Sequence, residues 1–106
     1  MGEELAEYWV SHKRMNKEDT RINEVRARML TDDGLSLPLG YNREDVIQSL
    51  NNNDKWYTCL FKEERNSKNI WTKKAEIHIV EVDGENFIRT DKNQTKADNL
   101  GELPDF

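Results

Sequence analysis

Two stretches near the N-terminus alternate between apolar and polar positions, which is the pattern of a β-strand buried on one side. Residues 8–14 alternate in this way, and residues 22–29 do so more clearly. The polar segment 16–20 between them has the composition of a turn, so the two stretches predict a β-hairpin. The apolar side chains near the start would also share one face of a helix, so strand and helix both stay open for residues 3–14.

The clearest helix signal begins at Asn42. Its side chain can accept hydrogen bonds from the first free amides of a helix. Glu44 and Asp45 follow in the first turn, where the helix dipole favours acidic residues. A narrow apolar stripe comes next, formed by Val46, Ile47 and Leu50. So short a helix is marginal in isolation, and the sequence therefore predicts that this stripe packs on a sheet.

Three further strands are predicted in the second half of the chain. Residues 56–61 are dense in aromatic and β-branched side chains. Residues 75–82 and 85–90 flank Asp83-Gly84, which is the composition of a two-residue hairpin turn. These segments predict a three-strand meander.

The two-residue turn also fixes the register of its hairpin. It sets His78 opposite Arg89 and Ile79 opposite Ile88. Ile77, Ile79 and Ile88 would then share the side that faces the core. The face that carries His78 and Arg89 is mixed in polarity, and we expect it to be solvated.

These elements predict an α+β fold, in which one helix packs on one face of an antiparallel sheet of about five strands. The strands are the N-terminal hairpin and the C-terminal meander. The length suits one small domain over residues 1–106, with a core at about 7–90, a polar linker at 91–97 and a tail at 98–106. The tail regains apolar residues and is predicted to cap the core, and a docking peptide for a partner is the alternative.

The charge balance limits the kinds of partner. The 106 residues include 16 basic and 21 acidic side chains, which gives a formal net charge of −5. Basic residues are interleaved with acids, which argues against a general nucleic-acid binder. No stretch approaches the ~20 apolar residues of a membrane span. Cys59 is the single cysteine, and the N-terminal residues have no features of a secretory signal, so we expect no membrane association and a cytoplasmic location.

No catalytic template is found in the sequence. The glycines are scattered, without the spacing of a nucleophile elbow, a phosphate-binding loop or a dinucleotide fingerprint. His12 and His78 are too far apart in sequence for a local metal site, and Cys59 is interpreted as a small buried hydrophobe. We therefore expect no enzymatic activity, no catalytic residues, no metal and no cofactor.

Aromatic residues are more numerous than one small core needs, with three Trp, three Tyr and three Phe. Trp71 precedes two lysines, and a ring beside a cation can stack on a base or on a partner's cation. A neutral His78 beside the guanidinium of Arg89 could hold an anion. The candidate interaction residues are therefore Trp9, Arg14, Trp71, His78 and Arg89.

We therefore expect a non-enzymatic protein-interaction or regulatory module, present as a monomer or homodimer, whose partner is another protein. The alternative is a nucleic-acid or nucleotide-binding module. Its contacts would be Trp71, Lys73, Lys74 and Arg89.

The order of these elements, together with three short segments, resembles a known family. The segments are AEIHIVEVDG at 75–84, FIRT at 87–90 and DNLGELPDF at 98–106. From Tyr8 to Phe106 the chain is similar to a family of small bacterial proteins, known only as domain of unknown function 3892. The resemblance implies a compact stand-alone domain in a bacterial or bacteriophage setting, and it provides no activity, cofactor or catalytic residue.

Overall fold

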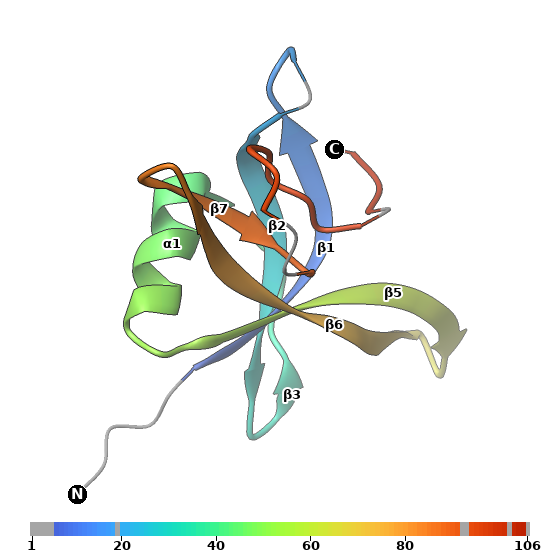
Figure 1. Ribbon diagram of the computed structural model, residues 1–106. Coiled ribbons are helices and arrows are strands. Elements are labelled where there is room, and N and C mark those ends of the chain that lie inside the picture. The colour runs from blue at the N-terminus through green and yellow to red at the C-terminus, as the bar shows by residue number, and fades with distance from the viewer. Residues whose placement is uncertain (1–5, 19, 92–93, 102, 106) are drawn as a thin grey trace, which may run out of the picture.

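The computed structural model describes residues 6–18, 20–91, 94–101 and 103–105. Residues 3–5 of the predicted first segment, 92–93 of the linker and Phe106 of the tail lie outside these ranges. The described part contains seven strands and one helix (Figure 1). In chain order they are β1 (Glu7–Met15), β2 (Ile22–Thr31), β3 (Gly34–Leu35), β4 (Leu39–Asn42), α1 (Arg43–Asn51), β5 (Lys55–Arg65), β6 (Lys68–Val82) and β7 (Glu85–Arg89).

The strands form a single mixed sheet in the order β3-β2-β1-β5-β6-β7, with β4 also paired to β2. Most neighbours are antiparallel, but β1 and β5 are parallel from the pair Glu7 and Lys55 to the pair Val10 and Thr58. Because β4 is antiparallel to β2, it runs in the same direction as β1 and β5. Helix α1 therefore acts as the crossover that parallel strands require.

The predicted α+β class, with an antiparallel sheet of about five strands, is wrong. Strands dominate the chain, the sheet has seven strands, and it includes a parallel pair. The two strands that the sequence did not reveal are β3 and β4, with two and four residues. Such short segments cannot display an alternation of apolar and polar positions, and pairing between distant segments leaves no local pattern.

The N-terminal segment is a strand in its described part, and the predicted hairpin of β1 and β2 is present. Val10 is fully buried, and the side chain of the preceding residue, Trp9, points to the opposite face of the sheet, as the alternation of a strand requires. The pairing slips between Val10 and His12, which leaves Ser11 as a bulge and increases the local twist.

Helix α1 begins where the sequence predicts. The Asn42 side chain accepts a hydrogen bond from the Asp45 amide at 2.8 Å, and the Asp45 carboxylate accepts one from the Asn42 amide at 3.2 Å. This reciprocal capping box satisfies two amides that would otherwise be free. Val46 and Ile47 are buried against the sheet. No helix in the described ranges is long and apolar enough to cross a membrane.

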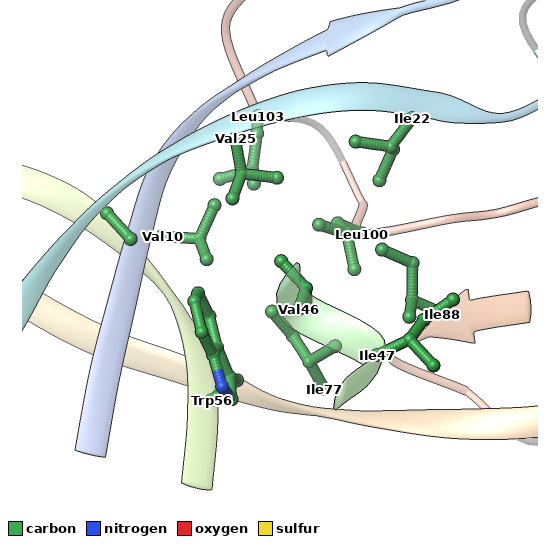
Figure 2. Packing of buried hydrophobic residues seen from close by; sticks show 11 residues of the cluster. Val10, Ile22, Val25, Val46, Ile47, Trp56, Ile77, Ile88, Leu100 and Leu103 are labelled. Carbon is green, nitrogen blue, oxygen red and sulfur yellow. The ribbon is translucent and has the colours of Figure 1, made fainter. Parts of the chain in front are cut away.

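The hydrophobic core lies between α1 and the curled sheet (Figure 2). Trp56 is its largest side chain, and only 1% of its surface is exposed. Leu100 and Leu103 of the C-terminal tail are also buried in this cluster. The other members are Val10, Ile22, Val25, Ala27, Val46, Ile47, Ile77 and Ile88.

The tail closes the sheet by pairing with two strands. Asn99 donates a backbone hydrogen bond to Ile88 of β7 and accepts one from Thr90, the residue after β7, both at 2.9 Å. Further along, the Lys13 amide of β1 donates to the Pro104 carbonyl at 3.0 Å. The tail thus spans the gap between β7 and the part of β1 that β5 does not cover.

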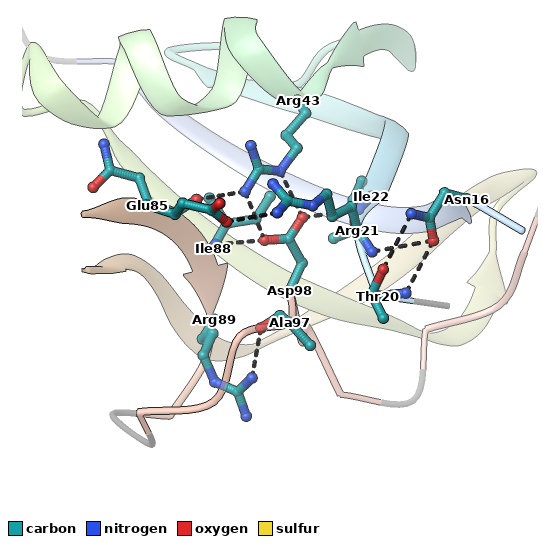
Figure 3. Close-up of polar contacts among 11 residues, drawn as sticks. Asn16, Thr20, Arg21, Ile22, Arg43, Glu85, Ile88, Arg89, Ala97 and Asp98 are labelled. Atoms are coloured by element: carbon teal, nitrogen blue, oxygen red, sulfur yellow. Dashed lines mark hydrogen bonds and ion pairs between the residues drawn. The ribbon is translucent and has the colours of Figure 1, made fainter. Parts of the chain in front are cut away.

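One buried carboxylate joins the tail to the rest of the molecule (Figure 3). The Asp98 side chain is fully buried and accepts hydrogen bonds from the amides of Ile22 at 2.8 Å and Ile88 at 2.9 Å. It also accepts from Nε of Arg43 at 2.7 Å and from its Nη2 at 3.1 Å. The Asp98 amide donates to the Thr20 carbonyl at 2.8 Å. The start of α1, β2 and β7 therefore meet at a single residue of the tail.

The register of the β6–β7 hairpin is confirmed, with His78 opposite Arg89 and Ile79 opposite Ile88. Asp83 and Gly84 both have positive φ angles, 52° and 83°, as a two-residue hairpin turn of this kind requires.

The expectation that one face of this hairpin is solvated is wrong. Val80, Phe87 and Arg89 on that face are all buried. The guanidinium carbons of Arg21 and Arg43 lie 5.1 and 5.8 Å from the centre of the Phe87 ring. The tail covers Arg89, so both faces of the hairpin are enclosed.

Replacing Asp98 should be strongly destabilising. In Asp98→Ala, two buried amides and the Arg43 guanidinium lose their acceptor, and removing one partner of a buried ion pair costs about 3–5 kcal/mol. Urea unfolding followed by tryptophan fluorescence measures the loss.

Asp105→Ala is the matched control in the same tail. Asp105 pairs with Lys13 at 3.6 Å, but its side chain is 77% exposed, so its loss should cost about 1 kcal/mol or less. Equal losses in the two variants would contradict the role assigned to Asp98.

Candidate functional site

The face of the sheet opposite the core carries a continuous group of aromatic and basic side chains. Trp9 on β1 lies opposite Arg28 on β2 and next to Tyr57 on β5. Phe61 on β5 lies opposite Trp71 on β6. We call this surface the aromatic–basic face, and its members are Trp9, Arg28, Tyr57, Phe61, Trp71 and Lys73.

Lys73 holds one half of this face together. Its Nζ atom lies 4.2 Å from the centre of the Tyr57 ring and 6.0 Å from that of Trp9. The same atom is 3.4 Å from Oε2 of Glu7, which accepts a hydrogen bond from the Trp9 indole at 2.8 Å. These contacts fix the orientation of both rings, which stay partly exposed.

Arg28 and Trp71 form the other half. The guanidinium carbon of Arg28 is 5.2 Å from the Trp71 ring, and Phe61 meets that ring edge to face at 5.6 Å. Phe61 is 52% exposed. Buried Nε of Arg28 and Nε1 of Trp71 have no hydrogen-bond partner among the described residues. Unsatisfied buried donors are uncommon, and a functional surface is one place where they are tolerated.

The surroundings add positive charge to the face. Arg26 comes two residues before Arg28 on β2, at the neighbouring outward position, and lies opposite His12 on β1. Burial lowers the pKa of His12, and the positive charges of Arg26 and Arg28 lower this pKa further. His12 therefore remains neutral at pH 7, so the charge here comes from the arginines.

The structure brings together only some of the residues that the sequence suggested. Trp9, Trp71 and Lys73 lie on the aromatic–basic face. Arg14 lies further along β1 and forms an ion pair with Glu24 at 3.7 Å. Lys74 is exposed on β6. The remaining two candidates lie in the β6–β7 hairpin, away from this face.

His78 and Arg89 are both engaged by the linker rather than open to a ligand (Figure 3 shows Arg89). Arg89 is 4% exposed and donates to both carboxylate oxygens of Asp91, at 2.6 and 3.1 Å, and to the Ala97 carbonyl at 2.6 Å. The hydrogen bond to Asp91 raises the pKa of Arg89. His78 Nε2 donates to the Asp91 carbonyl. These two side chains therefore hold the chain that follows β7.

The sequence reasoning missed Arg28, Tyr57 and Phe61. The sequence contained a signal for Tyr57. Successive side chains of β5 point to opposite faces, and because Trp56 lies in the core, Tyr57 points to the outer face. The same alternation in β2 places Arg28 on the outer face, because the preceding residue, Ala27, points into the core. What the sequence did not reveal is that β1 pairs with β5, which joins the predicted hairpin to the predicted meander.

The comparison with known proteins identifies the family. Residues 9–104 match the family described as "Protein of unknown function (DUF3892)". The chain belongs to this family. No curated protein and no solved structure matches it. The resemblance to the DUF3892 family is thereby confirmed, and since the family's description assigns no activity, any function has to be argued from the residues.

Cys59 lies beneath the aromatic–basic face and is fully buried. Its thiol donates to the Val10 carbonyl at 3.5 Å. Burial raises the pKa of this thiol to about 11, although the charge of Arg28 acts in the opposite direction. The group is therefore protonated at neutral pH, and a protonated thiol is a poor nucleophile. Among the described residues, no group of three or more His, Cys, Asp or Glu side chains could hold a metal ion.

We expect Cys59 to react slowly with a thiol-specific disulfide reagent. At pH 8, a pKa of about 11 leaves roughly 10⁻³ of the thiol ionised, against roughly a quarter for an ordinary cysteine. The folded protein should therefore react about two orders of magnitude more slowly than the chain unfolded in urea. Its rate should rise about tenfold per pH unit between pH 8 and 10, and a plateau above pH 9 would contradict the raised pKa.

Proposed function

We propose that this protein is a non-enzymatic protein-interaction module that binds its partner through the aromatic–basic face. The observation that carries the proposal is the collection of Trp9, Tyr57, Phe61 and Trp71 on one side of the sheet, next to Arg28. Trp, Tyr and Arg are the residues that contribute most binding energy in protein interfaces. Trp9, Tyr57 and Trp71 are held by cation–π contacts and Phe61 by the Trp71 ring, so these rings lose little conformational freedom on binding.

The charge of the face indicates the chemistry of the partner. The whole chain has a net charge of −5, yet Arg26 and Arg28 lie on or beside this one surface, where the charge of Lys73 is balanced by Glu7. Opposite charges across an interface increase the association rate and exclude wrong partners. The partner segment should therefore combine acidic side chains with apolar ones.

A protein partner is better supported than a nucleic acid. Phosphate binding depends on several available cations, whereas Lys73 already pairs with Glu7. Base stacking needs open ring faces, whereas the Tyr57 and Trp71 rings each have a cation of this chain over them. Arg89, which the nucleic-acid alternative would use, is buried against its own linker.

The environment of the two groups most suited to catalysis supports a non-enzymatic role. The Cys59 thiol is buried and protonated at neutral pH, and His78 donates a hydrogen bond to a backbone carbonyl. The free thiol of Cys59 also suits the cytoplasm, the compartment that we propose.

Capture from an extract of the native host, with variants of the face, tests the proposal. Phe61→Ser and Arg28→Glu should each reduce recovery of the partner protein at least about tenfold, which corresponds to about 1.4 kcal/mol of binding energy. Recovery should be unaffected by nuclease treatment. Quantitative mass spectrometry of the eluates measures both effects.

Each variant has a control at a residue that is not a member of the face. Leu37→Ser removes another exposed apolar side chain, and Lys17→Glu reverses a basic charge at an exposed position. Both controls should retain the partner. Equal recovery by Phe61→Ser and Leu37→Ser would reject the face as the binding surface, and recovery of nucleic acid that is lost at higher salt would favour the alternative.

A further inference from the structure

A second group of aromatic rings lies on the other side of β1, at the open end of the core. Tyr8 stacks on Trp56, with ring centres 4.2 Å apart and planes at 17°. Tyr41 stands edge-on to both rings, at 5.6 Å from Tyr8 and 5.4 Å from Trp56. The three residues line a pocket of about 440 Å³ beside α1.

Two carboxylates line the same pocket. Asp45 accepts a hydrogen bond from the Asn42 amide at 3.2 Å. Asp54 accepts one from the Ala6 amide at 3.1 Å and one from the Ser49 hydroxyl at 2.5 Å. All these donors are neutral, and neither carboxylate forms an ion pair within the described ranges. The pocket therefore contains two negative charges that no side-chain cation of the described chain balances.

Burial, and to a lesser extent this negative charge, raises the pKa of both tyrosines. Burial and then the charge of Asp54 raise the pKa of Tyr8. Burial raises the pKa of Tyr41, followed by the effects of Tyr8 and Asp45. Both phenols are therefore neutral at pH 7, and the faces of their rings, which are electron-rich, can attract a cation.

We propose that this pocket binds an organic ammonium group, in contact with Tyr8 and Tyr41 and balanced in charge by Asp45 and Asp54. Aromatic rings attract ammonium groups through their quadrupoles, and carboxylates nearby add Coulomb attraction. A hard metal ion is a worse fit, since it needs several oxygen ligands, and no group of three or more candidate ligand residues is found in the described part.

The ammonium group could come from a small molecule or from a lysine side chain. In both cases the chemistry is the same: an alkylammonium with an apolar surface that fits against the rings. The site is separate from the aromatic–basic face, so neither proposal depends on the other.

Titration with choline, followed by NMR shifts of the Trp56 indole, tests the pocket. The control ligand is 3,3-dimethylbutan-1-ol, which has the same shape without the charge. Choline should shift the Trp56 signal in a saturable way, and the neutral alcohol should bind at least about tenfold more weakly. Equal shifts by the two ligands, or no shift by choline at about 50 mM, would overturn the proposal.

Variants assign the binding to the named residues. Tyr41→Leu removes a ring and should weaken choline binding about tenfold, whereas Tyr41→Phe keeps the ring and should stay within about twofold. Asp54→Asn removes a charge but keeps an acceptor oxygen, and should weaken binding at least about threefold. Asp33→Asn, in an exposed turn, removes a charge elsewhere and should have no effect. If Asp54→Asn and Asp33→Asn behave alike, the carboxylate has no role and the proposal fails.

The source of the ammonium group is tested in parallel. N-acetyl-trimethyllysine amide is compared with choline, and N-acetyl-norleucine amide is the uncharged control. Binding of the trimethyllysine compound at least about tenfold tighter than choline would indicate a protein side chain, and the reverse order a small molecule. Binding of the norleucine compound as tight as that of trimethyllysine would overturn the proposal.

Discussion

The carboxylate of Asp98 and its partners can be buried only together. Its charge is removed from water, and this is tolerable because Arg43 and two backbone amides surround it. Those amides belong to Ile22 on β2 and Ile88 on β7, which are far apart in the sheet order. The tail must therefore return to a fixed place, and by doing so it joins the last strand to the first hairpin.

This closure determines which parts of the sheet stay exposed in the described structure. Because the tail and linker cover β7, Arg89 is used to hold Asp91 and Ala97. No described segment of the chain covers the outer face of β1, β2, β5 and β6 in this way, and it is there that Phe61 stays half exposed. Arg89, which the sequence suggested as a binding residue, therefore has a structural role. The exposed aromatic side chains lie instead on the outer face of β1, β2, β5 and β6.

The parts of the fold that the sequence predicts are those whose signal is local. The turn at Asp83-Gly84 and the cap at Asn42 each depend on a few adjacent residues, and both are correct. The pairing of Glu7 with Lys55 joins residues far apart in sequence and leaves no local trace. The burial of Arg89 depends likewise on the tail. Tyr57 and Phe61 could have been placed outward from the alternation of β5, but their neighbours could not.

Strand β1 connects the two surfaces that we propose for binding. Its alternation directs Tyr8 to the pocket beside α1 and Trp9 to the aromatic–basic face. Both surfaces contain aromatic rings, and the rings alone discriminate poorly between ligands of different charge. Charge makes the difference, because Asp54 lines the pocket at Tyr8 whereas Lys73 and Arg28 accompany the rings around Trp9. If both proposals hold, one strand presents similar rings to ligands of opposite charge, and the charged residues nearby decide which ligand each side accepts.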